Sequence, residues 1–307
     1  MLLKNRNLFG IKDLSVEDIM AIFEKAKEFK ALSRSKIKKN SLLRGKTVVN
    51  LFFENSTRTR SSFEIAGKRL GADVINMSVS TSSIKKGESL IDTAKTLDAM
   101  KADLYVIRHS QAGAPKMFSK YVSGQVINAG DGVHEHPTQA LLDGFTIYET
   151  GKKFKDLNVA IIGDILHSRV ARSDIYLLKK LGANVTLVGP ATLIPDEFKS
   201  FGVEIENNLD NILGKMDVIN LLRIQLERQG DSLFPSLDEY HNFFGLNDER
   251  LKKMKEDAII MHPGPMNRGV EISFDVADCK QQVILDQVEN GVAIRMALLA
   301  LIIEGSE

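Results

Sequence analysis

The chain has 307 residues, which exceeds the size at which one hydrophobic core keeps growing, so we expect two domains. Apolar residues make up 43% of the sequence and charged residues 26%, a balance typical of globular proteins. A formal net charge of +1 excludes a general attraction to nucleic acid or to membranes, so an anion site would have to be built locally from converging arginines.

Cys279 is the only cysteine, which excludes an internal disulfide and fits a reducing compartment. Residues 1–7 lack the apolar stretch and the small-residue cleavage site of a secretory signal. The longest apolar run, residues 296–303, is too short to cross a bilayer. We therefore expect a cytoplasmic protein without membrane or nucleic-acid partners.

The first half of the chain alternates helical and strand patterns. After an amphipathic helix at 15–29 and a basic loop at 34–39, we expect strands at 47–53, 74–77, 103–107 and 125–128, and helices at 60–70, 88–100 and 114–121. Residues 78–87 are mostly polar, with a composition typical of flexible segments, and are predicted to form a loop. Strands that alternate with helices indicate βαβ units and a mainly parallel sheet.

A long helix at 137–150, with Pro137 in its first turn, leads into a second series. There we expect strands at 157–162, 184–188, 217–221 and 258–261, a helix at 169–181, a long mobile segment with short helices at 225–250, and a closing helix at 291–304. The predicted fold class is α/β, with two doubly wound parallel-sheet domains joined by the long helix.

The most informative stretch is residues 52–60, which read Phe-Phe-Glu-Asn-Ser-Thr-Arg-Thr-Arg. Ser56, Thr57, Arg58 and Thr59 stand where a buried strand passes into a helix, where backbone N–H groups and the positive end of the helix dipole favour an anion. Hydroxyl and guanidinium groups add donors that suit phosphate. The alternative is a simple helix N-cap followed by solvated arginines.

Other polar clusters also follow predicted strands, where parallel sheets bind their ligands. In the first half these are Arg108 with its two following residues, and the sequence His136-Pro137-Thr138-Gln139, which could hold an amide-like group. A metal at His134-Glu135-His136 is the weaker interpretation, because partners at standard zinc spacing are missing.

In the second half, Arg169 and Arg223 follow two strands of the predicted second sheet and are expected to bind carboxylates, although each alone would more often be a surface charge. The sequence contains no NTPase P-loop, no complete dinucleotide fingerprint and no triad spaced for covalent catalysis. We therefore expect catalysis by positioning and electrostatic stabilisation, without a metal or a cofactor.

Together these motifs resemble the carbamoyltransferase family. Residues 52–60 and 136–139 match its shared signatures, whereas residues 223–228, Arg-Ile-Gln-Leu-Glu-Arg, and His262-Pro263-Gly264-Pro265 look like those of its aspartate-specific branch. The resemblance covers essentially the whole chain. It implies transfer of the carbamoyl group of carbamoyl phosphate to L-aspartate, the second step of de novo pyrimidine synthesis.

The resemblance also implies roles for individual residues. The implied catalytic residues are Arg58, Thr59, Lys86, Arg108 and His136. The implied carbamoyl phosphate ligands are Ser56, Thr57, Arg58, Thr59, Ser82, Lys86, Arg108, His136, Gln139, Gly264 and Pro265. The implied aspartate ligands are Lys86, Arg169, Arg223 and Gln225. Some family members carry a leucine where this chain has Gly264, so a mostly backbone contribution is expected there.

The resemblance further implies a carbamoyl phosphate domain at 1–136, on which a helix at 290–305 packs back, an aspartate domain at 150–287, and a connecting helix at 137–149. In the family, a loop reaches into the neighbouring subunit, which here implies a homotrimer that shares Ser82 and Lys86 across the interface. The active site would lie in a cleft between domains and between subunits. Whether regulatory chains or a dihydroorotase associate stays open.

Two alternatives remain. Ornithine carbamoyltransferases, or enzymes for another amine, share the phosphate motif but characteristically carry a His-Cys-Leu-Pro motif where residues 262–265 of this chain read His-Pro-Gly-Pro. The other alternative is a non-catalytic subunit that keeps the fold; the intact Arg58, Arg108, His136 and Gln139 argue against it.

Overall fold

The computed structural model describes residues 3, 6–78, 88–224 and 236–303. The chain forms two compact units: unit 1 consists of Met1–Leu142 and Val288–Glu307, and unit 2 of Asp143–Gln287. Each unit is built around one sheet in which every strand pairing is parallel. The divisions between the units fall inside helices α5 (Pro137–Glu149) and α9 (Ile284–Ile303). The predicted α/β fold class with two parallel sheets is confirmed.

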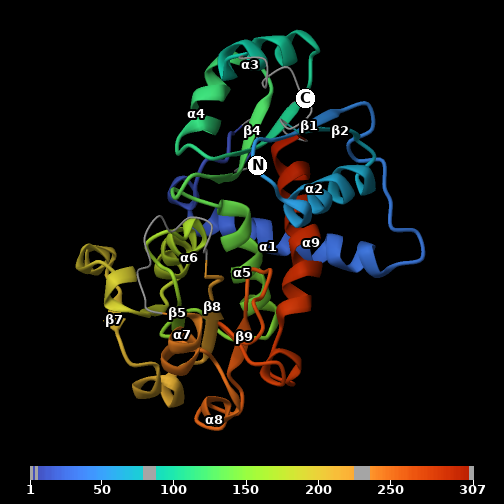
Figure 1. Ribbon diagram of the computed structural model, residues 1–307. Coiled ribbons are helices and arrows are strands. Elements are labelled where there is room, and N and C mark those ends of the chain that lie inside the picture. The colour runs from blue at the N-terminus through green and yellow to red at the C-terminus, as the bar shows by residue number, and fades with distance from the viewer. Residues whose placement is uncertain (1–2, 4–5, 79–87, 225–235, 304–307) are drawn as a thin grey trace. The chain divides into compact units, whose positions relative to one another are not determined.

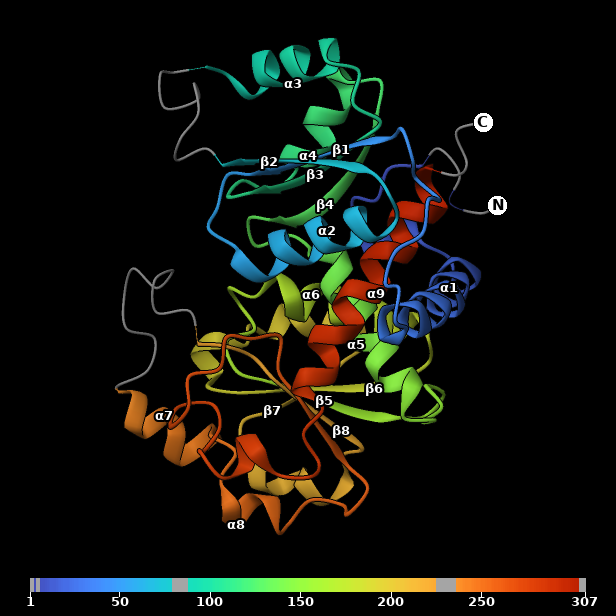
Figure 2. The ribbon, with the colours of Figure 1, turned by 90° about the vertical axis from the view of Figure 1, so that its right-hand side faces the viewer.

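Unit 1 contains a four-stranded sheet in the order β2-β1-β3-β4. Its strands are β1 (Thr47–Phe52), β2 (Asp73–Ser78), β3 (Leu104–His109) and β4 (Gln125–Asp131). Helix α2 (Thr57–Arg69) covers one face, whereas α3 (Leu90–Ala99) and α4 (Ala114–Phe118) lie on the other (Figures 1 and 2). Strands β1 and β3 are largely buried because helices cover both faces of the sheet.

Helix α2 lies very close to the sheet. A Cβ added at Gly67 would meet Val74 Cγ2 at 2.6 Å, so the glycine permits this approach of helix to strand. One turn earlier on α2, the guanidinium of Arg295 lies 5.2 Å from the centre of the Phe63 ring. Helix α1 (Val16–Arg34) is tied to α9 by ion pairs from Lys30 and Arg34 to Glu289.

Unit 2 contains a five-stranded sheet in the order β7-β6-β5-β8-β9. Its strands are β5 (Asn158–Ile162), β6 (Asn184–Val188), β7 (Glu204–Glu206), β8 (Val218–Leu221) and β9 (Ile259–Met261). Helix α6 (Arg169–Lys180) lies on one face, and α7 (Leu237–Phe244) and α8 (Asp248–Leu251) lie on the other (Figure 2).

The alternation of side chains along β5 divides the core of unit 2. Ala160 and Ile162 belong to a buried cluster that includes Tyr240 and Phe244 of α7. Val159, which points to the opposite face, lines a small cavity together with Leu177 of α6. Short 3-10 helices connect the remaining elements of the chain at Ile11–Asp13, Ser119–Tyr121, Ala191–Leu193, Asp196–Phe201, Leu209–Asn211, Leu213–Lys215 and Val276–Asp278.

Several expected boundaries were wrong. Helix α1 continues to Arg34, five residues beyond its expected end, into the stretch predicted to be a basic loop. Helix α2 begins at Thr57 rather than at residue 60, and α9 begins at Ile284 rather than at 291. Strand β7 was not predicted. Among the described residues, no helix combines the length and apolarity that a bilayer crossing requires.

Candidate functional site

The carboxyl ends of three adjacent strands bring the predicted clusters of unit 1 to one edge of its sheet. Phe52 at the end of β1 lies opposite Arg108 in β3, and His109 lies opposite Asp131 at the end of β4. The segments that follow these strands carry residues 56–60, 110–113 and 134–139. The topology thus places all three clusters at the edge where parallel sheets bind ligands.

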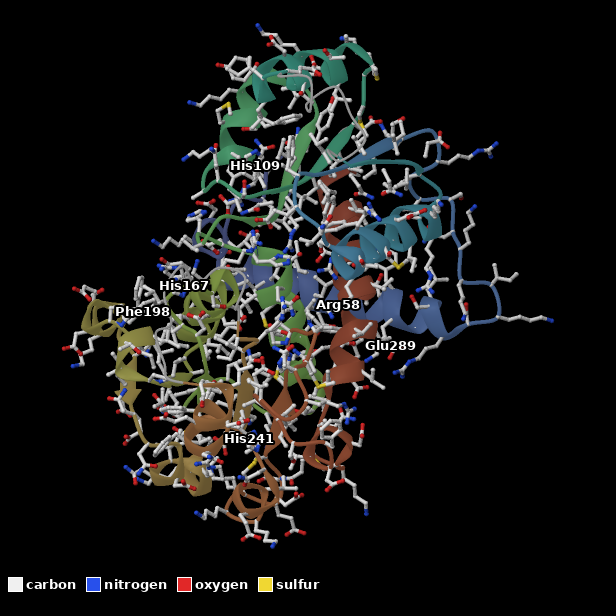
Figure 3. All side chains as sticks on the ribbon, viewed as in Figure 1. Arg58, His109, His167, Phe198, His241 and Glu289 are labelled. Atoms are coloured by element: carbon white, nitrogen blue, oxygen red, sulfur yellow. The ribbon has the colours of Figure 1, made fainter. Side chains whose placement is uncertain are left out.

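Ser56 occupies the N-cap position of α2 with an extended backbone, but its side chain forms no capping hydrogen bond. Thr57 is exposed and Thr59 is buried. Arg58, which Figure 3 labels, is exposed. The first turn of the helix contains no acidic residue, so its positive dipole end is not offset by a carboxylate within the helix. The geometry therefore favours an anion site over the alternative of a simple helix N-cap.

Arg108 is the second-last residue of β3, and its side chain is half-buried. Its Nε donates a hydrogen bond to Glu54 Oε2 at 3.1 Å, and both side chains are only partly exposed. The neighbouring His109 contacts Phe53 with ring centres 4.7 Å apart and ring planes tilted by 52°. Burial lowers the pKa of His109, so its imidazole is neutral at neutral pH and Arg108 supplies the positive charge at this strand end.

The segment before α5 is organised by Asp131. Its carboxylate, 1% exposed, accepts hydrogen bonds from Gly113 N at 2.6 Å, Asn128 Nδ2 at 2.8 Å and Glu135 N at 3.3 Å, and it contacts the His134 ring at 3.1 Å. These contacts tie the segment after β3 to the one after β4.

His136 and Gln139 are both buried, 4% and 8% exposed. The His136 carbonyl accepts the backbone N–H of Gln139 at 2.9 Å, so His136 starts α5 through its backbone. The imidazole of His136 and the amide of Gln139 are therefore held one helical turn apart.

Within the described ranges, no group of three or more His, Cys, Asp or Glu side chains is arranged to hold a metal ion.

In unit 2, the predicted clusters follow three adjacent strands, β5, β8 and β9. Arg169 is the first residue of α6 and is 3% exposed, and Ser168 caps this helix by accepting the N–H of Ala171 at 3.1 Å. Arg223 follows β8 and is half-buried. The Gly264–Pro265 peptide, which is cis, follows β9. Both predicted carboxylate-binding arginines therefore stand at the same sheet edge.

Buried carboxylates hold these segments in place. Asp164, fully buried, contacts the His167 ring at 2.9 Å within the turn that leads to α6, where Figure 3 labels His167. Glu271 accepts hydrogen bonds from Ile224 N at 2.7 Å and from Asn267 N at 2.8 Å, and so ties the segment after β8 to the one after β9. Burial raises the pKa of Glu271, and these donors oppose the rise.

Three predicted site residues, Ser82, Lys86 and Gln225, lie outside the described residues. Four carboxylates that organise the candidate site were not predicted from the sequence: Glu54, Asp131, Asp164 and Glu271. A signal existed for two of them, because Asp131 and Asp164 each precede a histidine by three residues, at positions 134 and 167. No comparable pattern marks Glu54, whose partner Arg108 is distant in sequence, or Glu271, which accepts from Ile224 N and from Asn267.

Comparison with known proteins places the chain in a family. Its residues 6–149 match the carbamoyl-P binding domain of aspartate/ornithine carbamoyltransferase, and residues 155–302 match the Asp/Orn binding domain of the same family. The chain is 56% identical, over 307 residues, to the aspartate carbamoyltransferase catalytic subunit of Syntrophotalea carbinolica, covering 100% of this chain and 98% of that one.

Solved structures show the same similarity. The chain is 33% identical to aspartate transcarbamoylase from Trypanosoma cruzi in complex with carbamoyl phosphate and aspartate, with a TM-score of 0.89 over 98% of each chain. It is 31% identical to ornithine carbamoyltransferase from Pyrococcus furiosus, with a TM-score of 0.87 over 99% of each chain. This chain therefore belongs to the aspartate/ornithine carbamoyltransferase family.

Proposed function

We propose that this chain is an enzyme that transfers the carbamoyl group of carbamoyl phosphate to the amino group of L-aspartate. The products are N-carbamoyl-L-aspartate and phosphate, in the second step of de novo pyrimidine synthesis. The observation that carries the proposal is the gathering of cationic and amide side chains at adjacent strand ends in each unit. The name shared by relatives that are 56% identical supports aspartate as the acceptor.

Unit 1 is proposed to bind carbamoyl phosphate. The phosphate ligands are Ser56, Thr57, Arg58, Thr59 and Arg108. Thr59, Arg108 and His136 polarise the carbonyl oxygen, and Gln139 holds the carbamoyl NH₂ group. The start of α2 supports the first role, because a helix N-terminus without an acidic first turn attracts a dianion.

Unit 2 is proposed to bind aspartate. Arg169 and Arg223 grip its two carboxylates with the help of Gln225, and the backbone at Gly264 and Pro265 helps to align the two substrates. A guanidinium group forms paired hydrogen bonds to a carboxylate, so two arginines at one sheet edge suit a dicarboxylate better than the cationic side chain of ornithine.

The chemistry needs no covalent enzyme intermediate. The neutral amine of aspartate attacks the carbonyl carbon, and a C–N bond forms while negative charge develops on the carbonyl oxygen. Oriented donors from Arg108 and His136 stabilise this charge. The C–O bond to phosphate then breaks with its electron pair, and the leaving phosphate accepts the amine proton. The reaction as written uses neither a metal nor a cofactor.

The proposed assembly is a homotrimer in the cytoplasm. Ser82 and Lys86 are proposed to reach the site of a neighbouring subunit, where Lys86 adds positive charge near both substrates. The support for this is the family membership of the chain and the polar composition of residues 78–87. Mixing an inactive Lys86→Ala chain with an inactive Arg108→Ala chain tests it, because shared sites restore part of the activity only in mixed trimers.

The deciding experiment is a colorimetric assay for ureido products with purified protein, carbamoyl phosphate and either L-aspartate or L-ornithine. We expect carbamoyl-aspartate and phosphate in equal amounts and no product from ornithine. Turnover of ornithine alone would support the other branch of the family. No turnover of either amine, by a protein that is folded by circular dichroism, would support a non-catalytic subunit.

A further inference from the structure

A large pocket opens at the amino edge of the unit 2 sheet, whereas Arg169 and Arg223 follow strands at its carboxyl edge. The volume of the pocket is about 690 Å³. Asn158, Asn184 and Glu204, which begin the adjacent strands β5, β6 and β7, line it. Strand β5 is five residues long, so at about 3.3 Å per residue the two edges lie about 16 Å apart. The pocket is therefore distinct from the candidate aspartate cluster.

Three lysines from separate segments bring positive charge to this pocket. Lys179 stands in the last turn of α6, Lys215 ends a short 3-10 helix, and Lys255 precedes β9. Lys255 is paired with Asp217 at 2.6 Å. In the part of the chain that the structure describes, neither Lys179 nor Lys215 forms an ion pair. Two ammonium groups can therefore bind a phosphate group, which lysine holds as a point charge.

Two glutamates of β7 lie near these lysines. Glu206 accepts hydrogen bonds from Asn208 N at 2.8 Å and from Asn211 Nδ2 at 3.3 Å. The pKa of Glu206 is lowered chiefly by the backbone N–H of Asn208, and the charge of Lys215 adds to this effect. Glu204 is exposed and is the one acidic residue within the described ranges that lines the pocket. Glu206 thus binds the loop that follows it, whereas Glu204 can contact a ligand.

The sheet also presents uncharged polar groups to the pocket. Asn184 Nδ2 donates to Asn158 Oδ1 at 3.2 Å across the β5–β6 pair. Thr186 lies beside Glu204 in the β6–β7 register, is 5% exposed and lines the pocket. Its hydroxyl forms no hydrogen bond with any residue that the structure describes. Because buried polar groups are normally hydrogen-bonded, an unpaired hydroxyl in the wall of a pocket favours a polar ligand.

The composition of the wall selects among anionic ligands. A carboxylate such as that of Glu204 repels a bare inorganic anion but accepts hydrogen bonds from sugar hydroxyls. The amides of Asn158 and Asn184 and the hydroxyl of Thr186 also suit hydroxyl groups. The volume lies in the range of about 300–1,000 Å³ that holds small organic molecules.

We propose that this pocket binds a phosphorylated sugar. Lys179 and Lys215 hold the phosphate group, while Thr186, Glu204 and the paired asparagines hold the hydroxyl groups. The pocket is separate from the residues assigned to carbamoyl phosphate and to aspartate, and its test needs no turnover. The proposal therefore stands independently of the proposed function.

Met216 provides a reporter inside the pocket. Its side chain is buried and lines the pocket, and its NMR signal is identified by its absence from the spectrum of Met216→Leu. The full-length protein, labelled at its methionine methyl groups, is titrated with ribose 5-phosphate. We expect a saturable shift of the Met216 signal and no shift for Met100, an exposed residue of unit 1. A Met216 signal that stays in place overturns the proposal, even where phosphate binds to unit 1.

Inorganic phosphate and ribose, titrated separately, test the two parts of the ligand. Each offers only one set of contacts, so each should bind at the Met216 reporter at least about tenfold more weakly than ribose 5-phosphate. Inorganic phosphate that binds as tightly would overturn the role of the hydroxyl-binding groups. Ribose that binds as tightly would overturn the role of the lysines.

The lysines are tested by a pair of charge-matched variants. Lys179→Ala/Lys215→Ala should weaken ribose 5-phosphate at least about tenfold, because two charged contacts are lost. Lys199→Ala/Lys252→Ala removes the same charge from exposed lysines of unit 2 that do not line the pocket, and should leave the affinity within about twofold. Equal weakening by the two pairs would indicate general attraction of an anion to unit 2 and would overturn the site.

Thr186→Val separates a built site from electrostatic attraction, because it removes a hydroxyl without changing charge or side-chain shape. It should weaken ribose 5-phosphate about two- to tenfold, the usual loss for one hydrogen bond. The thermal unfolding midpoint should not fall, since no described residue hydrogen-bonds this hydroxyl. Unchanged affinity in Thr186→Val would overturn the proposed contact with the sugar.

Discussion

Arg108 Nε lies 3.1 Å from Glu54 Oε2, so the end of β3 is joined to the segment between β1 and α2. Because Glu54 contacts Nε, its carboxylate sets the orientation of the guanidinium plane about the end of the arginine side chain. The pair thus links a predicted phosphate ligand to the chain that leads directly to Ser56. An unpaired glutamate beside an anion site would repel the anion. Because Glu54 is paired with Arg108, it instead orients the guanidinium that donates to the anion.

Arg108→Ala should lower kcat/KM about a hundred- to a thousandfold, because the variant loses a charged donor to the oxygen on which charge develops. Arg44→Ala is the matched control, since Arg44 is an exposed arginine of the same unit and should keep normal kinetics. Glu54→Gln preserves an oxygen acceptor for Nε and should cost much less than Arg108→Ala. The measurement is steady-state carbamoyl-aspartate formation, and near-normal turnover of Arg108→Ala would contradict its assigned role.

Arg223→Ala should raise KM for aspartate about ten- to a hundredfold, the loss expected for one charge-assisted hydrogen-bonding site. KM for carbamoyl phosphate should change little, because that substrate is assigned to unit 1. Lys199→Ala, at an exposed lysine of unit 2, provides the control. A variant in which both KM values rise together would indicate a general disturbance rather than loss of an aspartate ligand.

Much of the fold could be predicted from sequence because parallel strands are buried on both faces and form short apolar runs. Residues 184–188 illustrate this, since β6 has the predicted bounds. Strand β7 escaped prediction because it is three residues long and lies at the edge of the sheet, where its glutamates contact solvent. Helix α9 was predicted to start too late because polar residues interrupt the apolar pattern in its first turns. One of them, Gln287, is buried and donates a hydrogen bond to Asp143, a contact that no local pattern reveals.

The site clusters could be predicted because they follow apolar runs that end at one sheet edge. Their supporting partners could not, because contacts such as Glu54 with Arg108 or Glu271 with Ile224 depend on which strand ends become neighbours. The same holds for Asp143 and Asp174, which are 31 residues apart and line one small cavity of unit 2 only because α5 and α6 both pack there.

Tyr105→Phe should leave stability at neutral pH unchanged or raise it by about 1 kcal/mol. Tyr105 is fully buried, and no group in residues 6–78, 88–224 or 236–303 hydrogen-bonds its hydroxyl, so the substitution removes a desolvated polar group without breaking a bond. Its ring contact with Phe118, at 5.4 Å between centres, is retained.

The same variant should alter alkaline unfolding. Burial raises the pKa of Tyr105 to about 12, so ionisation is favoured in the unfolded chain. The stabilisation from a neutral tyrosine is complete below the ordinary tyrosine pKa of about 10 and is lost as the pH rises from there toward the folded value. Urea unfolding at a series of alkaline pH values should show a shallower loss of stability in Tyr105→Phe. Parallel curves for the two proteins would contradict this account.

Gly189→Ala should destabilise unit 2 by about 1–3 kcal/mol, the usual cost of overpacking. A Cβ at this position would lie 2.8 Å from the carbonyl oxygen of Gly163, a backbone atom that cannot rotate away. Gly163 begins the turn that leads to Arg169, so the displaced backbone should also raise KM for aspartate. Gly214→Ala is the control: it is an exposed position of the same unit where the new Cβ would meet Lys253 O at an ordinary 3.4 Å. The measurement is the thermal unfolding midpoint of both variants, which should be lower for Gly189→Ala. Equal midpoints would mean that the ends of β5 and β6 can move apart at Gly189 without a loss of stability.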